Sequence, residues 1–66
     1  MTKPKITIAE IRAKNGKMTQ REFGDSVGVA PQTVNSWEKD IYRISAKNLM
    51  KICEIYHVTS SDLLGT

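Results

Sequence analysis

Apolar residues recur at helical spacing along most of the chain, with polar residues between them. Neighbouring apolar residues are three or four positions apart in four stripes, formed by Ile8 and Ile11, by Phe23 and Val27, by Val34 and Trp37, and by Leu49, Ile52, Cys53 and Tyr56. A short fifth apolar segment contains Leu63 and Leu64. No segment alternates with the period of two that marks a half-buried strand. The pattern therefore predicts an all-α fold of five helices.

The expected helix starts carry capping residues. Three of them pair a threonine with an acidic residue three positions later, the capping-box pattern, at Thr7 and Glu10, Thr19 and Glu22, and Thr59 and Asp62. Ser45 is the expected cap of the fourth helix. Pro31 suits the first position of the third helix, where a missing N–H has no cost, and Gly28 can end the second helix in the left-handed conformation.

Length and composition indicate one small domain. Of the 66 residues, 39% are hydrophobic, enough for a single core, so we expect a flexible basic arm at residues 1–6 and one domain at residues 7–66. The net charge of +3 favours a polyanionic partner without proving one. The single cysteine and the absence of a long apolar run predict a cytoplasmic protein without a membrane span.

Catalytic and metal-binding patterns are missing from the sequence. Cys53 and His57 are four positions apart, a spacing that can place both on one metal, but two ligands do not make a site and Cys53 belongs to an apolar stripe. No phosphate-binding glycine loop and no nucleophile paired with a base is present. We expect neither an enzyme nor a cofactor.

Gly24 lies inside the predicted second helix, where glycine is unfavourable relative to alanine by about 1 kcal/mol. Its presence indicates a close approach of another segment, and we expect that segment to be the crossing third helix. On this interpretation valine at position 24 is disruptive and alanine is tolerated. A surface glycine without a role is the alternative.

The outer face of the third helix is polar and almost uncharged. Gln32, Asn35, Ser36 and Lys39 share this face, opposite Val34 and Trp37. Glutamine and asparagine match the paired donor and acceptor of adenine, and serine can donate or accept, so the face is suited to reading base edges. A solvated face without function is the alternative.

Arg12 and Glu38 each border an apolar stripe. Arg12 follows Ile11 and Glu38 follows Trp37, so both charged groups are expected at the edge of the core. Because charged groups that lose water need partners, we expect an ion pair between the first and third helices, with two separate exposed side chains as the alternative.

The order of these features resembles the helix-turn-helix domain of the Cro and C1 repressor type, also called the xenobiotic-response-element family. The resemblance extends from about Ile8 to Gly65 and is carried by Thr19-Gln20, Phe23-Gly24, Gly28-Val29, Thr33-Val34, Trp37-Glu38, Leu49, Ile52 and Asp62-Leu63-Leu64. It implies a compact, lambda-repressor-like domain of five helices whose third helix enters the major groove of double-stranded DNA. It also implies the same bridge between Arg12 and Glu38.

The resemblance further implies roles for individual residues. It assigns base reading to Gln32, Asn35 and Ser36, and contacts with the DNA backbone to Gln20, Thr33, Lys39, Tyr42 and Arg43. Simple packing within the loop is the alternative for Tyr42.

Four residues depart from the family pattern. Gly24 replaces the usual alanine and Ala30 the usual serine or threonine cap. Pro31 stands where a side chain often contacts DNA, and Asp40 where glycine or asparagine often ends the helix. The departures at Ala30 and Pro31 leave base reading more dependent on Gln32 and Ser36.

These features predict a sequence-specific transcriptional regulator, most simply a phage or bacterial repressor that binds a palindromic operator as a dimer. We expect weak self-association through an apolar patch at Leu63, Leu64 and Val58. Repression would follow from covering a promoter, and contact with RNA polymerase would allow activation instead. Two alternatives remain open: an antitoxin that holds a toxin and regulates its own gene, and the amino-terminal domain of a longer repressor.

Overall fold

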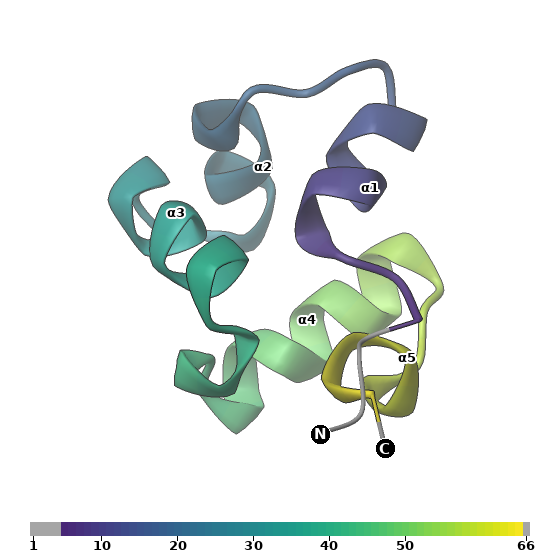
Figure 1. Cartoon of the computed structure of the whole chain (residues 1–66). Coiled ribbons are helices and arrows are strands. Elements are labelled where there is room, and N and C mark those ends of the chain that lie inside the picture. Colours follow the sequence, from purple (N-terminus) through teal and green to yellow (C-terminus); the bar gives the residue numbers. More distant parts are fainter. Residues whose placement is uncertain (1–4, 66) are drawn as a thin grey trace.

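The structure, a computed structural model, describes residues 5–65, and in that range it contains helices joined by short turns and no strand. Figure 1 shows the helices in chain order, which are α1 (Ile8–Lys14), α2 (Gln20–Val27), α3 (Pro31–Lys39), the 3-10 helix η1 (Ile41–Arg43), α4 (Ala46–Tyr56) and α5 (Ser60–Leu64). The predicted all-α fold with five α-helices is confirmed. The short helix η1 was not expected, since the sequence predicted a loop there.

Residues 1–4 of the expected basic arm lie outside the described residues. The two described residues of that arm are attached to α5. The backbone N–H groups of Lys5 and Ile6 donate to the carbonyl oxygen of Asp62, at 2.8 and 3.2 Å.

The capping residues form the helix ends that the sequence predicted, with one difference. The reciprocal hydrogen bonds of a capping box are present at α2, between Thr19 and Glu22, and again at the start of α5. At α1 the Thr7 hydroxyl accepts from the N–H of Glu10, but the Glu10 carboxylate receives the Thr7 hydroxyl and not the Thr7 N–H. Gly28 ends α2 with φ of 80°, in the left-handed region that glycine adopts without strain.

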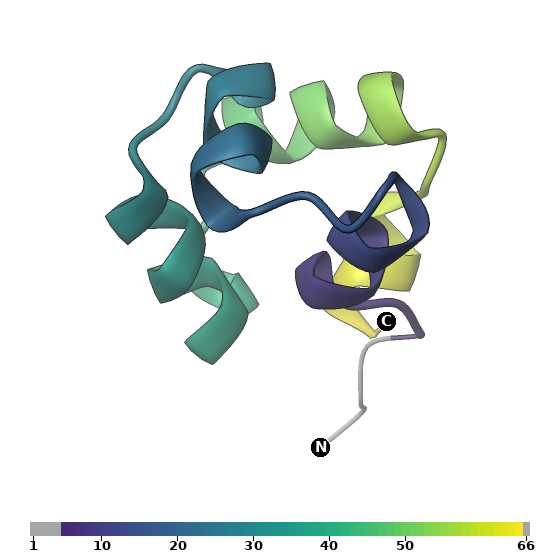
Figure 2. The ribbon, with the colours of Figure 1, turned by 90° about the horizontal axis from the view of Figure 1, so that it is seen from above.

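The core gathers side chains from all five α-helices. Its buried side chains are Ile8, Ile11, Phe23, Val27, Val34, Trp37, Ile52 and Leu63. The ring of Tyr56 stacks on that of Phe23, with 5.1 Å between centroids. In Figures 1 and 2, α3 lies at one edge of the domain beside α2, while α1 and α5 lie on the other side. The core therefore supports α3 from one face and leaves its other face free.

Gly24 is buried where the chain turns from α2 into α3, and the close neighbour differs from the expected one. A Cβ atom at position 24 would lie 2.5 Å from the carbonyl oxygen of Val29, in the turn, and 3.4 Å from a methyl group of Val34 on α3. The turn backbone, and not the crossing helix, is thus the closer obstacle. This geometry argues against the expectation that alanine is tolerated here, because a backbone oxygen cannot move away as the end of a flexible side chain can.

The carboxy-terminal leucines are used within the domain. Leu63 is 1% exposed, Val58 packs against the core and Leu64 is half-buried. The apolar patch expected there is wrong for Leu63, because α5 folds back and buries that side chain. The large apolar side chains that are exposed in residues 5–65 are Tyr42, Met50 and Ile55.

Candidate nucleic-acid interface

The outer face of α3 presents the polar residues that the sequence placed there. Gln32, Asn35 and Lys39 are exposed, while Thr33 and Ser36 are half-buried. Val34 and Trp37, on the opposite face, are buried at 0% and 4% exposure and fix the rotation of the helix about its axis. Because the core sets this rotation, the polar side chains of α3 are turned away from the core.

The start of α3 lacks a side-chain cap. Ala30 precedes the helix in an extended conformation and offers no hydrogen bond to the first turn, and Pro31 follows at the first helical position. The amides of the first turn of an uncapped helix carry partial positive charge. This end of α3 is therefore compatible with an anionic neighbour, although it does not by itself define a binding site.

Arg12 and Glu38 join α1 to α3. The Nε and Nη2 atoms of Arg12 donate to the two carboxylate oxygens of Glu38, at 2.7 and 3.0 Å. The side chains are 21% and 17% exposed, so the pair is partly shielded from water. The remaining terminal nitrogen of Arg12 donates to the carbonyl oxygen of Met18, which also fixes the loop before α2.

Gln20, the first residue of α2, connects this ion pair to the outer face of α3. Its side-chain nitrogen lies 3.3 Å from a carboxylate oxygen of Glu38 and 3.4 Å from the side-chain oxygen of Asn35. The structure thus brings together Gln20 and Asn35, two residues that the sequence assigned to the DNA backbone and to the bases. No pattern in the sequence indicated that Gln20 contacts Glu38, which is 18 positions away.

The segment after α3 holds Tyr42 and Arg43 in η1. The Asp40 carboxylate caps this helix by accepting from the N–H of Tyr42. The Tyr42 hydroxyl donates to the carbonyl oxygen of Leu64 at the end of α5, so the packing alternative describes this conformation. The Arg43 side chain is 69% exposed and lies 3.9 Å from the Asp40 carboxylate, a distance at which the attraction in water is weak.

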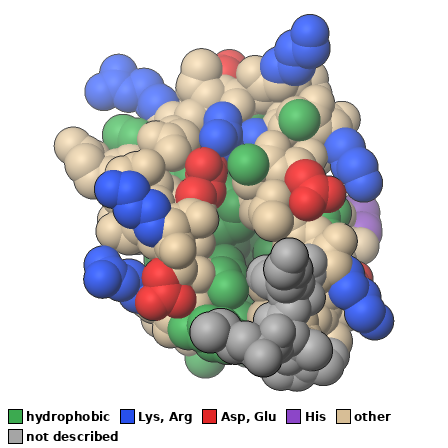
Figure 3. Space-filling view, viewed as in Figure 1, with side chains coloured by type: hydrophobic (Ala, Val, Ile, Leu, Met, Phe, Trp, Pro, Cys, Tyr) green, Lys and Arg blue, Asp and Glu red, His purple; other side chains and the backbone are tan. Residues whose placement is uncertain are grey.

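Basic side chains do not form one concentrated patch on the face seen in Figure 3. Lys and Arg side chains are spread around its outline, with acidic side chains between them. Charge on this face therefore does not mark a binding surface, and the polar side chains of α3 are its distinguishing feature.

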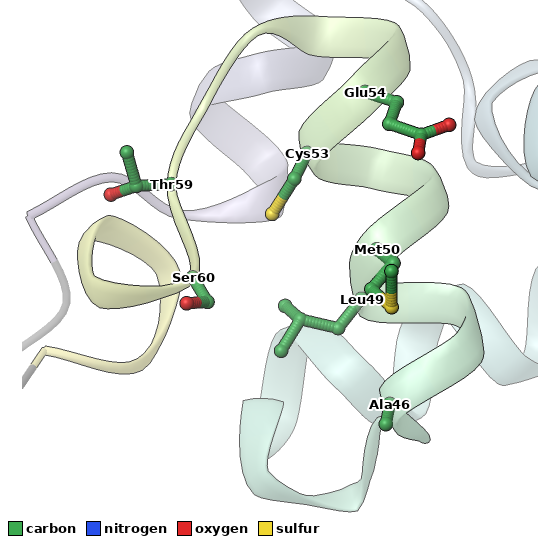
Figure 4. A pocket seen from close by; sticks show the side chains of 7 residues that line it. All are labelled: Ala46, Leu49, Met50, Cys53, Glu54, Thr59 and Ser60. Carbon is green, nitrogen blue, oxygen red and sulfur yellow. The ribbon is translucent and has the colours of Figure 1, made fainter.

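A second surface feature is a groove beside α4, away from α3. This open groove between α4 and the start of α5 is lined by Ala46, Leu49, Met50, Cys53, Glu54, Thr59 and Ser60. Figure 4 shows Leu49 and Cys53 pointing from α4 toward α5, while Glu54 points away from it. Burial raises the pKa of the Cys53 thiol, and the nearby carboxylate of Asp62 adds to the rise. The thiol is therefore neutral and not activated.

In the part of the chain that the structure describes, no three histidine, cysteine, aspartate or glutamate side chains are grouped as a metal site would require. No described helix is long and apolar enough to cross a membrane.

Comparisons with known proteins agree with this geometry. A family model described as helix-turn-helix matches residues 8–63. The chain is 36% identical over 59 residues to the uncharacterized HTH-type transcriptional regulator YgzD of Bacillus subtilis (strain 168), a match that covers 89% of this chain and 88% of that protein. No solved structure matches the chain.

Proposed function

The chain belongs to the Cro/C1-type helix-turn-helix family of DNA-binding transcriptional regulators, and from this premise we propose that it is a sequence-specific repressor. In the proposal the protein acts in the cytoplasm of a bacterium or on behalf of a phage, has no catalytic activity, and acts by occupying a palindromic operator. A bound repressor that covers a promoter excludes RNA polymerase from it. Contact with polymerase at the edge of the operator is the route by which the same protein would activate.

The single observation that carries the proposal is the outward polar face of α3. Gln32 and Asn35 are exposed there, while Val34 and Trp37 anchor the helix to the core from behind. An α-helix fits the major groove, where amide and hydroxyl side chains can distinguish base pairs. We assign base reading to Gln32, Asn35 and Ser36.

Phosphate contacts are assigned to residues that surround this face. Thr33 is at its edge, and Lys39 and Arg43 carry exposed positive charges near the end of α3. Gln20 and Tyr42 also belong to the set that the family resemblance assigns to the DNA backbone. Their donor groups are engaged within the protein, so a phosphate contact from either requires an exchange of hydrogen bonds.

Self-association of two copies is proposed through the exposed face of α4. Lys47, Met50 and Glu54 share one face of this helix, all three are exposed, and Met50 is 63% exposed. Neither Lys47 nor Glu54 is in an ion pair within residues 5–65. Antiparallel packing of two copies of α4 about Met50 would place Lys47 of each copy beside Glu54 of the other, as a two-fold contact requires. One helix face is a small contact, so the dimer should be weak without DNA.

Selection of bound sequences from random duplex DNA, followed by titration of the selected duplex and a scrambled one, tests the proposal. We expect a short consensus with two-fold symmetry and specific binding at least about a thousandfold tighter than binding to the scrambled duplex. Equal affinity for both duplexes would show that the protein does not read sequence. A consensus without symmetry would leave DNA recognition in place and remove the dimer.

A further inference from the structure

A chain of hydrogen bonds runs from α1 to the outer face of α3. Arg12 donates to both carboxylate oxygens of Glu38, and Gln20 donates from its side-chain nitrogen to the same carboxylate at 3.3 Å. The same nitrogen of Gln20 lies 3.4 Å from the side-chain oxygen of Asn35, which is exposed on the proposed reading face. The chain therefore begins at a partly buried ion pair and ends at a side chain that can touch DNA.

The chemistry of these groups determines which atom donates and which accepts in each of these hydrogen bonds. An ionised carboxylate only accepts hydrogen bonds, so Gln20 must turn its NH₂ group, and not its carbonyl oxygen, toward Glu38. The NH₂ group has two N–H donors, and the second one points to Asn35, whose side-chain oxygen accepts it. Asn35 is then left with its own two N–H donors for an outside partner, and Gln20 is left with its carbonyl oxygen.

A free amide side chain has no such preference, because it can rotate by half a turn and exchange its donor and acceptor. Gln32 on the same helix face is exposed, and its side chain has no hydrogen bond to any of residues 5–65 that would prevent the rotation. Asn35 differs from Gln32 in this respect, because its side-chain oxygen accepts from Gln20. The two amides on one reading face are therefore unequal in what they can offer to a base.

We propose that Glu38 is a specificity-determining positioning residue, which acts through Gln20 to make Asn35 a hydrogen-bond donor toward DNA. The inference rests on the proposed function, since it concerns how the same face reads bases. Donors in the major groove match guanine, with its N7 and O6 acceptors, and thymine, with its O4 acceptor. Cytosine presents an amino donor there and is disfavoured opposite Asn35. Adenine presents a donor beside its acceptor and is bound less well than by a freely rotating asparagine.

The test measures base preference at one operator position. Asn35→Ala identifies that position as the one at which the wild-type preference disappears. Duplexes carrying each of the four bases there are then titrated with the wild type, with Gln20→Met and with Asp25→Ala. Gln20→Met removes the hydrogen bonds of residue 20 at nearly constant length and leaves the pair of Arg12 and Glu38 in place. Asp25→Ala is the control, an exposed change on α2 outside both the hydrogen-bond chain and the residues assigned to DNA contacts.

The wild type should prefer guanine or thymine to cytosine by about tenfold at this position. Gln20→Met should reduce the preference to about threefold or less, because Asn35 can then rotate, while Asp25→Ala should leave it unchanged. Glu38→Gln should reduce the base preference as much as Gln20→Met does. The double variant should lose no more than either single variant, since both changes break the same series of hydrogen bonds. Thermal melts of each variant check that the fold persists, and if Glu38→Gln unfolds, Gln20→Met still decides.

Three outcomes would overturn the inference. A wild-type preference for cytosine or adenine at the Asn35 position would show that the amide accepts. An unchanged preference in Gln20→Met would show that Gln20 does not orient the Asn35 amide, while sequence recognition itself would stand. A wild type without a base preference at any operator position would contradict both the inference and the proposed function. The other two outcomes concern the inference alone.

Discussion

The carbonyl oxygen of Val29 lies where a side chain at Gly24 would have to begin, 2.5 Å from the ideal Cβ position. The two residues are also hydrogen bonded, since the N–H of Val29 donates to the carbonyl oxygen of Gly24 at 2.9 Å. This bond closes the turn between α2 and α3 tightly onto the last turn of α2. The turn that orients α3 thus depends on the absence of a side chain at position 24.

Gly24→Ala should therefore destabilise the domain by about 1 to 3 kcal/mol, because the new methyl group overlaps backbone atoms that move only if the turn opens. Gly24→Val should cost more, since its branched side chain also meets Val34. Thermal or urea unfolding measures both. Asp25→Ala, an exposed change one position along the same helix, should stay within about 0.5 kcal/mol of the wild type. Alanine as stable as glycine at position 24 would mean that the turn relaxes freely.

Removal of Glu38 should leave Arg12 partly shielded from water and without its anionic partner. Because both side chains keep about a fifth of their exposure, we expect Glu38→Ala to cost about 1 to 3 kcal/mol, less than for a fully buried pair. Arg12→Ala should cost at least as much, since the carbonyl of Met18 also loses a donor. In a double-mutant cycle measured by urea unfolding, the double variant should lose less than the sum of the single losses. Strict additivity would contradict an energetic link.

Different residues should be responsible for base recognition and for contacts with the DNA phosphates. Gln32→Ala should cost about 1 to 3 kcal/mol on the selected operator and hardly change affinity for a scrambled duplex. Arg43→Ala should weaken both duplexes about equally and lower the slope of log affinity against log salt by about one. Titrations at several salt concentrations measure both effects. If Gln32→Ala weakened the two duplexes alike, base reading by Gln32 would have to be abandoned.

Self-association should depend on the pairing of Lys47 of one copy with Glu54 of the other. Met50→Lys should weaken it by about tenfold or more without lowering the melting temperature, because this side chain is already exposed. Lys47→Glu should weaken it by bringing like charges together, and adding Glu54→Lys to the same chain should restore it. Sedimentation equilibrium at several concentrations measures the association. Ile55→Lys is the control, since Ile55 is exposed on a different side of α4. No recovery in the charge-swapped variant would contradict the antiparallel contact.

The Cys53 thiol should react slowly in the folded protein. Its pKa is raised above the ordinary value of 9.0, first by burial and then by the Asp62 carboxylate, so less thiolate is present at pH 8 than in the unfolded chain. Alkylation by iodoacetamide at that pH should be severalfold faster in urea.

The raised pKa of Cys53 also affects the free energy of unfolding. The stabilising contribution of the neutral thiol is complete below the pKa of the unfolded chain. It is lost as the pH rises through the folded value. Cys53→Ala should remove this part of the loss of stability at alkaline pH. Equal alkylation rates in water and in urea would contradict the prediction for the thiol.

The helix ends and the core could be predicted from sequence because local chemistry determines them. Thr19 and Glu22 satisfy each other's backbone across one turn, Pro31 fits only the start of a helix, and Gly28 adopts a conformation that other residues rarely take. The stripe of Val34 and Trp37 fixed which face of α3 is buried. These features need no knowledge of distant parts of the chain.

The contacts that the sequence did not predict join residues far apart in the chain. The hydrogen bond from Tyr42 to Leu64 depends on where α5 comes to lie, and no local pattern encodes that position. The link from Gln20 to Glu38 likewise needs the packing of α2 against α3. At Gly24 the sequence indicated a close neighbour correctly but not its identity, because the path of a turn backbone is not written in side-chain spacing.

The backbone bonds from Lys5 and Ile6 to Asp62 bring the beginning and the end of the described chain together at α5. Figures 1 and 2 show α5 on the side of the domain opposite α3. A mechanical pull applied at both ends would therefore load these bonds and the short helix first. The carbonyl oxygen of Leu64 at the end of α5 also accepts from Tyr42 in η1, so tension applied at the ends would pass from α5 into the segment that directly follows α3.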